Sequence, residues 1–237
     1  MLPMIAIFVS GFLVGFTGFG FNLLAVPALA LLTPAKDAVI VTLFLGTVVN
    51  VVMTVAYRRH VEVRVAAVLI AASVPGLLFG TVLFSLMTPG VLRVVIGALT
   101  VVFAVVLLLR KAPVAVTPRK LVTAGTGLLS GALTSTTGMG GPPVAAYLVS
   151  GVAEVDRVRA TLMFYTAMAS VAALALLGVS GDVSSGQMIQ AAQLAPFGLA
   201  GVVAGALVFR KFPHLYVRAV ALTLVLVGAG GFLVAVI

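Results

Sequence analysis

The sequence predicts an all-α polytopic membrane protein with two inverted repeats, each a glycine-broken re-entrant segment plus three transmembrane helices. Three observations predict this fold class. The 237-residue chain is 62% hydrophobic and 8% charged, with a mean hydropathy of +1.32, which is typical of a protein embedded in lipid. Its apolar runs reach the length of about 20 residues that one helix needs to cross a bilayer. A glycine-rich motif in the first half also recurs in the second half.

The two copies of this motif read GFLVGFTGFGFNLLAVP at residues 11–27 and GALTSTTGMGGPP at residues 131–143. A shift of 120 positions superimposes four residues: Gly11 on Gly131, Thr17 on Thr137, Gly18 on Gly138 and Gly20 on Gly140. The clustered glycines interrupt apolar runs that would otherwise continue as membrane helices. Glycine-broken segments at corresponding places in two halves indicate the binding site of a transporter.

The first repeat is assigned to residues 1–110. Its first apolar segment, residues 3–32, is too long for one ordinary span, and two shorter helices that meet at residues 17–20 explain it better. Three helices are expected to follow, at about residues 33–57, 63–87 and 89–109. The pairs Thr33-Pro34 and Thr88-Pro89 each offer an N-cap and a proline for the first helical position.

The second repeat is assigned to residues 111–237, and both repeats form one transmembrane domain. The connection at residues 110–120 holds four basic residues and two prolines and marks the boundary. A segment from Thr117-Pro118 to Ser150, broken at 136–143, precedes helices at about residues 154–177, 186–209 and 213–237. At an offset of 125, two glycines of the first half recur, and we interpret all four as helix-packing residues: Gly76, Gly80, Gly201 and Gly205.

The basic residues predict the topology. If every apolar segment crossed the membrane, each side would carry seven Lys or Arg residues, against the positive-inside rule. If both broken segments are hairpins, twelve lie on one side and only Lys36 and Arg93 on the other. This places the twelve in the cytoplasm and predicts six full spans with both termini outside. A hairpin in the second segment alone gives the same count, so only symmetry extends the hairpin to the first segment.

The two breaks favour an anion site near the bilayer midplane. Irregular backbone survives at that depth only where it lines a protein cavity, and each following half-helix presents unpaired N–H groups and the positive end of its dipole. Such ends bind an anion without a buried cation. Close helix packing is the alternative explanation for these glycines. The candidate substrate-binding residues are Thr17, Gly18, Phe19, Gly20, Asn22, Asn50, Thr136, Thr137, Gly138, Met139, Gly140, Gly141, Tyr165 and Ser170. Thr166, in the same expected helix as Tyr165 and Ser170, could line the same cavity.

Several other functions are excluded by residues that the sequence lacks. All five acidic residues fall at segment ends or in loops, so carboxylate relays and cation paths are disfavoured. The chain has no Cys, paired intramembrane aspartates or HExxH motif, so we expect no enzyme, no metal site and no cofactor. The net charge of +9 lies in loops between apolar runs, where it orients a membrane protein rather than binding nucleic acid.

Through the motifs GFTGFGFNLLAVP and GALTSTTGMGGPP, the duplicated organisation and its length, the chain resembles the TauE/SafE sulfite exporter family of bacterial membrane proteins. The resemblance implies a multi-pass transporter of the cell inner membrane. It also implies a small sulfur-containing oxyanion, such as sulfite or an organosulfonate, as the substrate. The first motif of the family is more glycine-rich, and this chain departs from it at Phe19, Phe21 and Asn22, which bears on the identity of the substrate.

The resulting hypothesis is an exporter that works by alternating access, with its two halves rocking about an anion held at the midplane. An anion channel is the first alternative, since sequence does not separate a pore from a carrier. A non-transporting membrane scaffold is the second, and it leaves the paired breaks unexplained. The expected partners are the anion and the lipid bilayer, and the sequence is compatible with a homo-oligomer.

Overall fold

The computed structural model describes residues 1–18, 20–109, 120–151 and 154–211, and within these ranges it contains helices and no strand. The α-helices are α1 Leu2–Thr17, α2 Phe21–Ala30, α3 Ala35–Tyr57, α4 Val63–Leu86, α5 Pro89–Leu109, α6 Lys120–Thr137, α7 Gly141–Gly151, α8 Val155–Val179 and α9 Ser185–Lys211. Five of them, α3, α4, α5, α8 and α9, are long and apolar enough to cross a membrane. The prediction of an all-α polytopic membrane protein is confirmed. The helix predicted at 213–237 lies outside the described residues.

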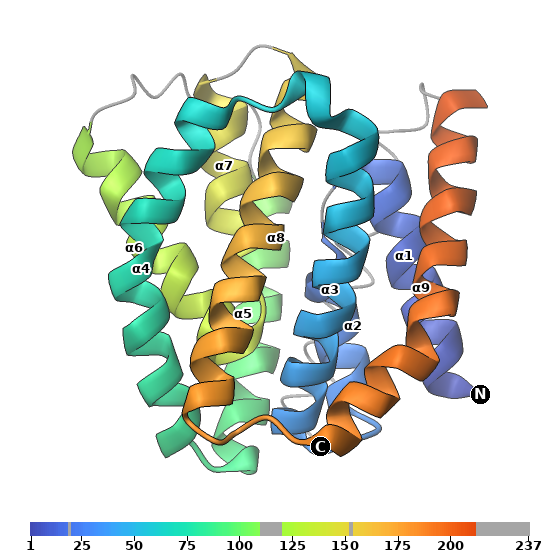
Figure 1. Cartoon of the computed structure of the whole chain (residues 1–237), viewed down its shortest axis with the longest axis vertical. Helices are drawn as coiled ribbons and strands as arrows, with labels where there is room; N and C mark the ends of the chain where they lie inside the picture. The colour runs from blue at the N-terminus through green and yellow to red at the C-terminus, as the bar shows by residue number, and fades with distance from the viewer. Residues whose placement is uncertain (19, 110–119, 152–153, 212–237) are drawn as a thin grey trace.

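The two glycine-broken segments form hairpins of short helices. α2 and α7 have 10 and 11 residues, about half of what a membrane span needs. α1 packs against α2, and α6 packs against α7. In Figure 1, α1 and α2 both reach the lower end of the bundle, whereas α6 and α7 both reach the upper end. The hairpins therefore approach the middle of the bundle from opposite ends.

The helix pairs α1/α9 and α4/α6 make the most extensive contacts, and the same glycines recur in both. A Cβ added at Gly76 or Gly80 would collide with the backbone of α6, at Leu128 and Ala132. A Cβ added to the equivalent glycines of α9 would collide with the backbone of α1, and the pairs are Gly201 with Phe8 and Gly205 with Phe12. The predicted packing role of these four glycines is confirmed, because only a missing side chain lets the backbones approach so closely.

The helix starts follow the sequence signals with one correction. The Thr88 hydroxyl accepts from the N–H of Val91 at 3.3 Å and so caps α5, as predicted. At the other expected cap, Pro34 is the N-cap of α3 and Ala35 is its first residue, so the predicted position is wrong by one. The Thr33 hydroxyl instead donates to the Leu29 carbonyl at 3.0 Å, in the last turn of α2.

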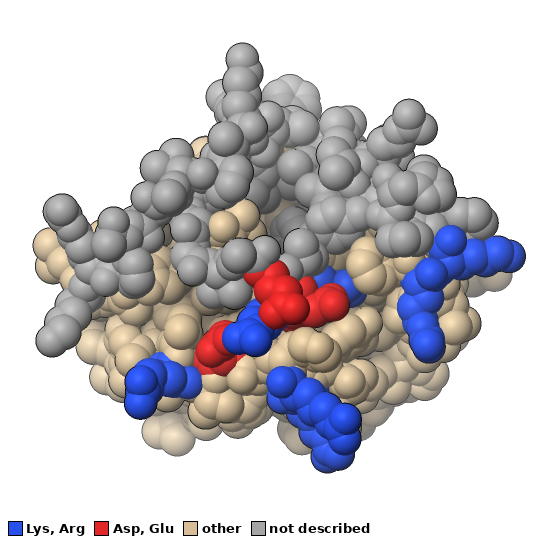
Figure 2. Space-filling view, turned by 90° about the horizontal axis from the view of Figure 1, so that it is seen from above, with Lys and Arg blue, Asp and Glu red and all other residues tan. Residues whose placement is uncertain are grey.

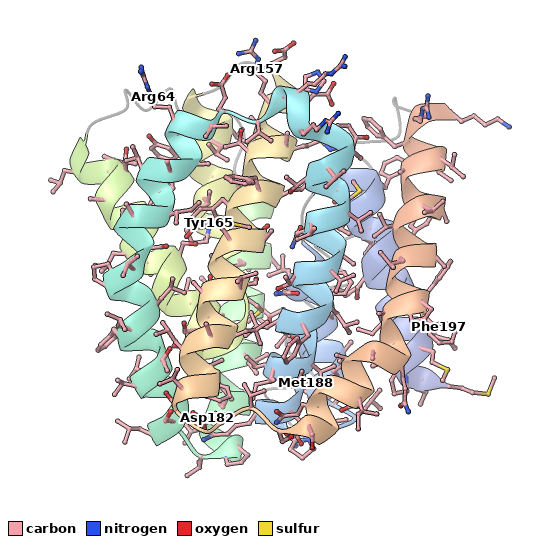
Figure 3. The ribbon with its side chains drawn as sticks, in the orientation of Figure 1. Arg64, Arg157, Tyr165, Asp182, Met188 and Phe197 are labelled. Atoms are coloured by element: carbon pink, nitrogen blue, oxygen red, sulfur yellow. The ribbon has the colours of Figure 1, made fainter. Side chains whose placement is uncertain are left out.

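Most described basic residues lie at one end of the bundle, which we call the basic end. They are Arg58, Arg59, Arg64, Arg157, Arg159, Arg210 and Lys211, and α6 also begins there. Figure 2 looks onto this end, and Figure 3 shows Arg64 and Arg157 at it, with Asp182 at the opposite end. Lys36 lies in the first turn of α3 and Arg93 at the start of the second turn of α5, both at the opposite end. For these residues the structure shows the grouping that hairpins predict. Arg110, Lys111, Arg119 and Arg218 lie outside the described residues.

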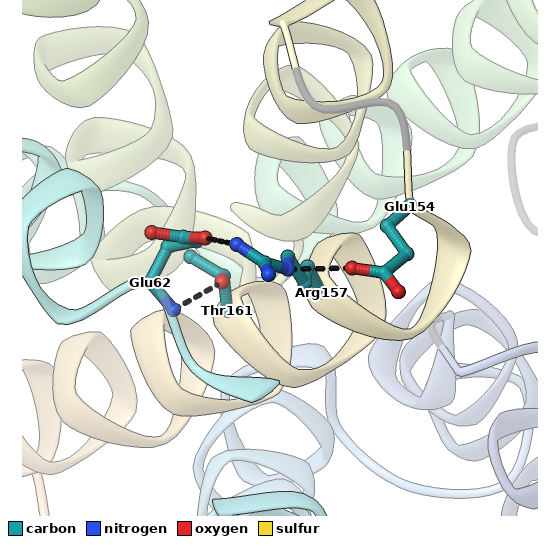
Figure 4. A network of polar contacts seen from close by, with 4 residues as sticks. All are labelled: Glu62, Glu154, Arg157 and Thr161. Carbon is teal, nitrogen blue, oxygen red and sulfur yellow. Dashed lines mark hydrogen bonds and ion pairs between the residues drawn. The ribbon is translucent and has the colours of Figure 1, made fainter. Parts of the chain in front are cut away.

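An ion-pair network at the basic end joins the first half of the chain to the second (Figure 4). The guanidinium of Arg157 contacts Glu62 and Glu154, each with a nitrogen to oxygen distance of 2.5 Å. The backbone N–H of Glu62 donates to the hydroxyl of Thr161 at 2.9 Å. These contacts tie the start of α4 to the start of α8, although exposed ion pairs of this kind add little stability.

Candidate functional site

Both breaks are built on glycines with positive φ. Gly18 (φ +84°) ends α1, Gly20 (φ +93°) begins α2, and Gly138 (φ +73°) follows the last residue of α6. This left-handed region costs other L residues about 1–2 kcal/mol, so glycine is what allows the chain to reverse here. In each hairpin the N–H of the first such glycine donates to the carbonyl four residues earlier. The distances are 2.7 Å to Val14 and 2.9 Å to Thr134.

The side chain of Asn22 connects the two breaks. Its Nδ2 donates a 2.8 Å hydrogen bond to the carbonyl oxygen of Gly138, 116 positions further along the chain. Its Oδ1 is buried without a hydrogen-bond partner in the described part of the chain. The amide also packs closely against Gly46, where an added Cβ would lie 2.6 Å from Oδ1. The first turn of α2 is thereby held against the break between α6 and α7.

A cavity of about 50 Å³ lies where the two breaks meet. This is several times the roughly 10–15 Å³ that one water molecule needs, and it suits a small oxyanion. Nine of the predicted site residues line the cavity: Gly18, Gly20, Asn22, Asn50, Gly138, Met139, Gly140, Gly141 and Ser170. The structure therefore brings together both motifs, the middle of α3 and the middle of α8. Phe19 lies outside the described residues.

Three predicted threonines do not line the cavity, and their hydroxyls are bonded elsewhere. Thr17 and Thr137 donate to carbonyls in their own helices, at 2.7 and 2.9 Å. Thr136 donates to the carbonyl of Gly80 at 3.1 Å and so stabilises the contact between α6 and α4. A threonine in a helix readily bonds the carbonyl one turn earlier, which removes its hydroxyl from a ligand.

Tyr165 also lies outside the cavity lining, but it contacts the second break indirectly. Its side chain is fully buried in the bundle (Figure 3), and its hydroxyl donates to Ser130 Oγ at 2.8 Å. The hydroxyl of Ser130 in turn donates to the carbonyl of Gly140 at 2.5 Å. Tyr165 is thus placed to hold the shape of the α6–α7 break rather than to contact a ligand.

Two cavity-lining polar side chains have no hydrogen bond to another described residue, namely those of Asn50 and Ser170. Both residues are buried, at 8% and 3% exposed. A polar ligand or water in the cavity would give these side chains hydrogen-bond partners. The side-chain amide of Asn50 offers two N–H donors and the hydroxyl of Ser170 offers one.

The backbone donors come mainly from the first hairpin. Phe21, Asn22 and Leu23 form the first turn of α2, line the cavity and carry N–H groups without an acceptor within the helix. The first turn of α7 is Gly141-Pro142-Pro143, and proline has no N–H. Of the unpaired N–H groups expected at the start of this half-helix, that turn therefore supplies only the N–H of Gly141. α7 still directs the positive end of its dipole toward the cavity.

Six residues line the cavity in addition to these nine candidates: Phe21, Leu23, Thr134, Pro142, Leu162 and Thr166. Phe21, Leu23, Thr134 and Pro142 lie inside the two motifs and were within reach of sequence reasoning. Leu162 and Thr166 share one face of α8 with Ser170, at spacings of four residues. Thr166 was expected from the sequence as a possible lining residue, and extending the same helical stripe by one more period would have found Leu162.

Comparison with known proteins identifies the family. Residues 3–231 match the family described as Sulfite exporter TauE/SafE, which is nearly the whole chain. The chain belongs to this family. No curated protein and no solved structure matches it. Membership makes this chain a multi-pass membrane transporter of the sulfite exporter type, in agreement with its apolar helices. In this TauE/SafE family member, residues of both hairpins line the cavity.

Proposed function

We propose that this exporter carries a small sulfur-containing oxyanion, sulfite or an organosulfonate, across the bacterial inner membrane, and that the anion binds between the two breaks. The observation that carries the proposal is the convergence of unpaired donors on one buried cavity. The first-turn N–H groups of α2, the N–H of Gly141 and the side chains of Asn50 and Ser170 all border it. Hydrogen-bond donors and helix N-termini without a carboxylate select an anion over a cation.

Alternating access about this cavity is the mechanism we favour. The recurring glycine contacts of α1/α9 and α4/α6 support two repeats of inverted orientation, and the hairpins approach from opposite ends. In inverted-repeat carriers the substrate lies between the repeats while one repeat rocks against the other. The hydrogen bond from Asn22 to Gly138 connects the two halves of the chain. We therefore expect this bond to break, and another to replace it, when the cavity opens to the other side.

Flux measurements on purified protein in proteoliposomes test this proposal. Wild-type protein should give saturable uptake of labelled sulfite, and unlabelled sulfite inside the vesicles should accelerate that uptake by counterflow. Acceleration by counterflow identifies a carrier, whereas flux that neither saturates nor accelerates identifies an anion channel. The absence of flux above empty liposomes for sulfite and for sulfoacetate would refute the proposed substrate class.

Asn50→Ala and Thr47→Ala are a matched pair of variants for the same assay. Both lie on α3, but the Thr47 hydroxyl donates to Leu43 in its own helix at 2.8 Å and does not line the cavity. Loss of a donor to an anion costs about 1.5–3 kcal/mol, so Asn50→Ala should raise the KM for sulfite about tenfold or more. The Thr47→Ala variant should keep the wild-type KM. Equal KM values for the two variants would exclude Asn50 from the site.

A further inference from the structure

A buried arginine lies beside the first break, where the sequence predicted only loop charges. Arg159 belongs to the second turn of α8 and its side chain is 3% exposed. Among the described residues its Nε has no hydrogen-bond partner, and neither has its Nη1. Nη2 donates to the carbonyl of Gly15 at 3.3 Å. The carboxylate of Asp156, whose side chain is half-exposed, lies 3.9 Å from Nη1. One weak bond and one long ion pair leave the guanidinium incompletely neutralised.

Two aromatic rings cover this guanidinium. Its carbon atom lies 4.4 Å from the ring centre of Phe209 and 5.4 Å from that of Tyr57. Cation–π contacts partly replace lost hydration, but they provide no acceptor for the free N–H groups. A buried charge without a full set of partners is strongly unfavourable, and an anionic ligand would compensate it.

Arg159 lies between the cavity-lining residues of α8 and the start of that helix at the basic end. It shares one face of α8 with the cavity residues Leu162, Thr166 and Ser170. Arg159 precedes Leu162 by three residues, about 4.5 Å along the helix axis toward the basic end. Its aliphatic carbons and Nε pack against Gly18, which itself lines the cavity, so closely that an added Cβ would overlap them. One glycine therefore contacts both the arginine and the site.

The geometry points to Arg159 as a second anion-binding position, where the oxyanion pauses between the cavity and the basic end. This inference rests on the proposed function. A guanidinium binds a planar pair of oxyanion oxygens through Nη2 together with either Nε or Nη1. Nε and Nη1 both lack a hydrogen-bond partner among the described residues, and Nη2 keeps a second N–H beside its bond to Gly15. Substrate arriving from the basic end meets this arginine first, and substrate leaving the cavity toward that end meets it last. Among the described residues at the opposite end, the cation beside an aromatic ring is Lys36, whose Nζ lies 5.2 Å from the ring centre of Phe84. Unlike Arg159, it is only half-buried, and it donates to the carbonyl of Ser85.

The test compares three variants with wild type: Arg159→Gln, Arg159→Lys and the matched control Arg157→Gln, which removes an exposed, ion-paired arginine two residues away. Sulfite flux is measured as a function of concentration in inverted and in right-side-out membrane vesicles, which expose opposite ends of the protein. We expect Arg159→Gln to raise the KM about tenfold or more from the basic end, and less than about twofold from the other end. Arg159→Lys should lie between it and wild type, because Lys keeps the charge and loses the fork.

Sidedness separates an anion-binding role from a structural one, since a structural defect would alter the KM from both ends. Size-exclusion chromatography shows whether each variant is folded. If Arg159→Gln aggregates, a KM increase of Arg159→Lys from the basic end alone provides the test of the inference. The inference is overturned if Arg159→Gln keeps the wild-type KM from the basic end, or if Arg159→Gln and Arg157→Gln change that KM equally. Flux by the wild-type protein would in that case still support the proposed function. Wild-type protein that moves neither sulfite nor sulfoacetate would overturn both.

Discussion

Substituting Gly18 or Gly20 by alanine should have unequal costs, although both glycines have positive φ in the same break. At Gly20 an added Cβ meets no atom within 4 Å, so Gly20→Ala should cost only the backbone strain of about 1–2 kcal/mol. At Gly18 the Cβ would overlap the Arg159 side chain, which adds an overpacking cost of about 1–3 kcal/mol. Gly18→Ala should therefore destabilise the protein by about 2–5 kcal/mol in total.

A double-mutant cycle isolates the second contribution. In an Arg159→Ala background, Gly18→Ala should cost only the strain, about 1–2 kcal/mol, because the overlapping side chain is gone. The free energy of unfolding is measured by titrating SDS into mixed micelles and following helical circular dichroism. Gly90→Ala is the control, because Gly90 has no positive φ and no atom within 4 Å of its added Cβ. Equal costs at Gly18 and Gly20, or the same cost of Gly18→Ala in both backgrounds, would refute the described contact.

Two further substitutions test the packing around the site, with the same unfolding measurement. Asn22→Leu leaves the Gly138 carbonyl without its donor and should cost about 1–3 kcal/mol, whereas an unchanged stability would show that the bond between the breaks is absent. Gly80→Ala and Gly205→Ala each push a Cβ into the backbone of a facing helix, at Ala132 and Phe12. Each should cost about 1–3 kcal/mol. If the destabilisations by Gly80→Ala and Gly205→Ala differ by more than about the size of either one, the packing in the two halves is not equivalent.

The glycine pattern made the breaks predictable. The balance of basic residues predicted the second hairpin, and the symmetry of the two halves extended that prediction to the first. Gly18, Gly20 and Gly138 do adopt positive φ, which only glycine adopts readily, so composition and conformation are directly linked there. Most of the described basic residues also gather at one end of the bundle. The breaks depend on the local sequence, and the grouping of charges depends on the membrane. Both features can be predicted without knowing which helices are in contact.

The details of the site depend on tertiary contacts and were harder to predict. Thr136 and Thr137 have the right chemistry, but their hydroxyls are bonded to helix carbonyls. The burial of Arg159 depends on the approach of α1, Phe209 and Tyr57 from distant parts of the chain, so it was counted as a loop charge. The shortage of donors in α7 was visible in Pro142 and Pro143, whose missing N–H groups are a property of the sequence itself.

The tight packing around Gly140 makes a substitution there a poor test of the site. A bulky substitution at Gly140 would force a side chain into Thr134 Oγ1 and the carbonyl of Ser130, which would disturb the packing of α6 as well as the cavity. Loss of transport in such a variant would not report on binding alone. Asn50→Ala removes cavity donors without adding atoms, and it is therefore the more specific test of the site.

The central claim is that an oxyanion binds between the two glycine breaks. The most direct measurement is a crystal structure of the wild-type protein soaked in selenite, with anomalous scattering recorded at the selenium edge, since selenite has the charge and shape of sulfite. The account predicts a selenium peak in the cavity, within hydrogen-bonding distance of the first-turn N–H groups of α2 and of the Asn50 amide. A selenium peak elsewhere in the bundle and none in this cavity would contradict it.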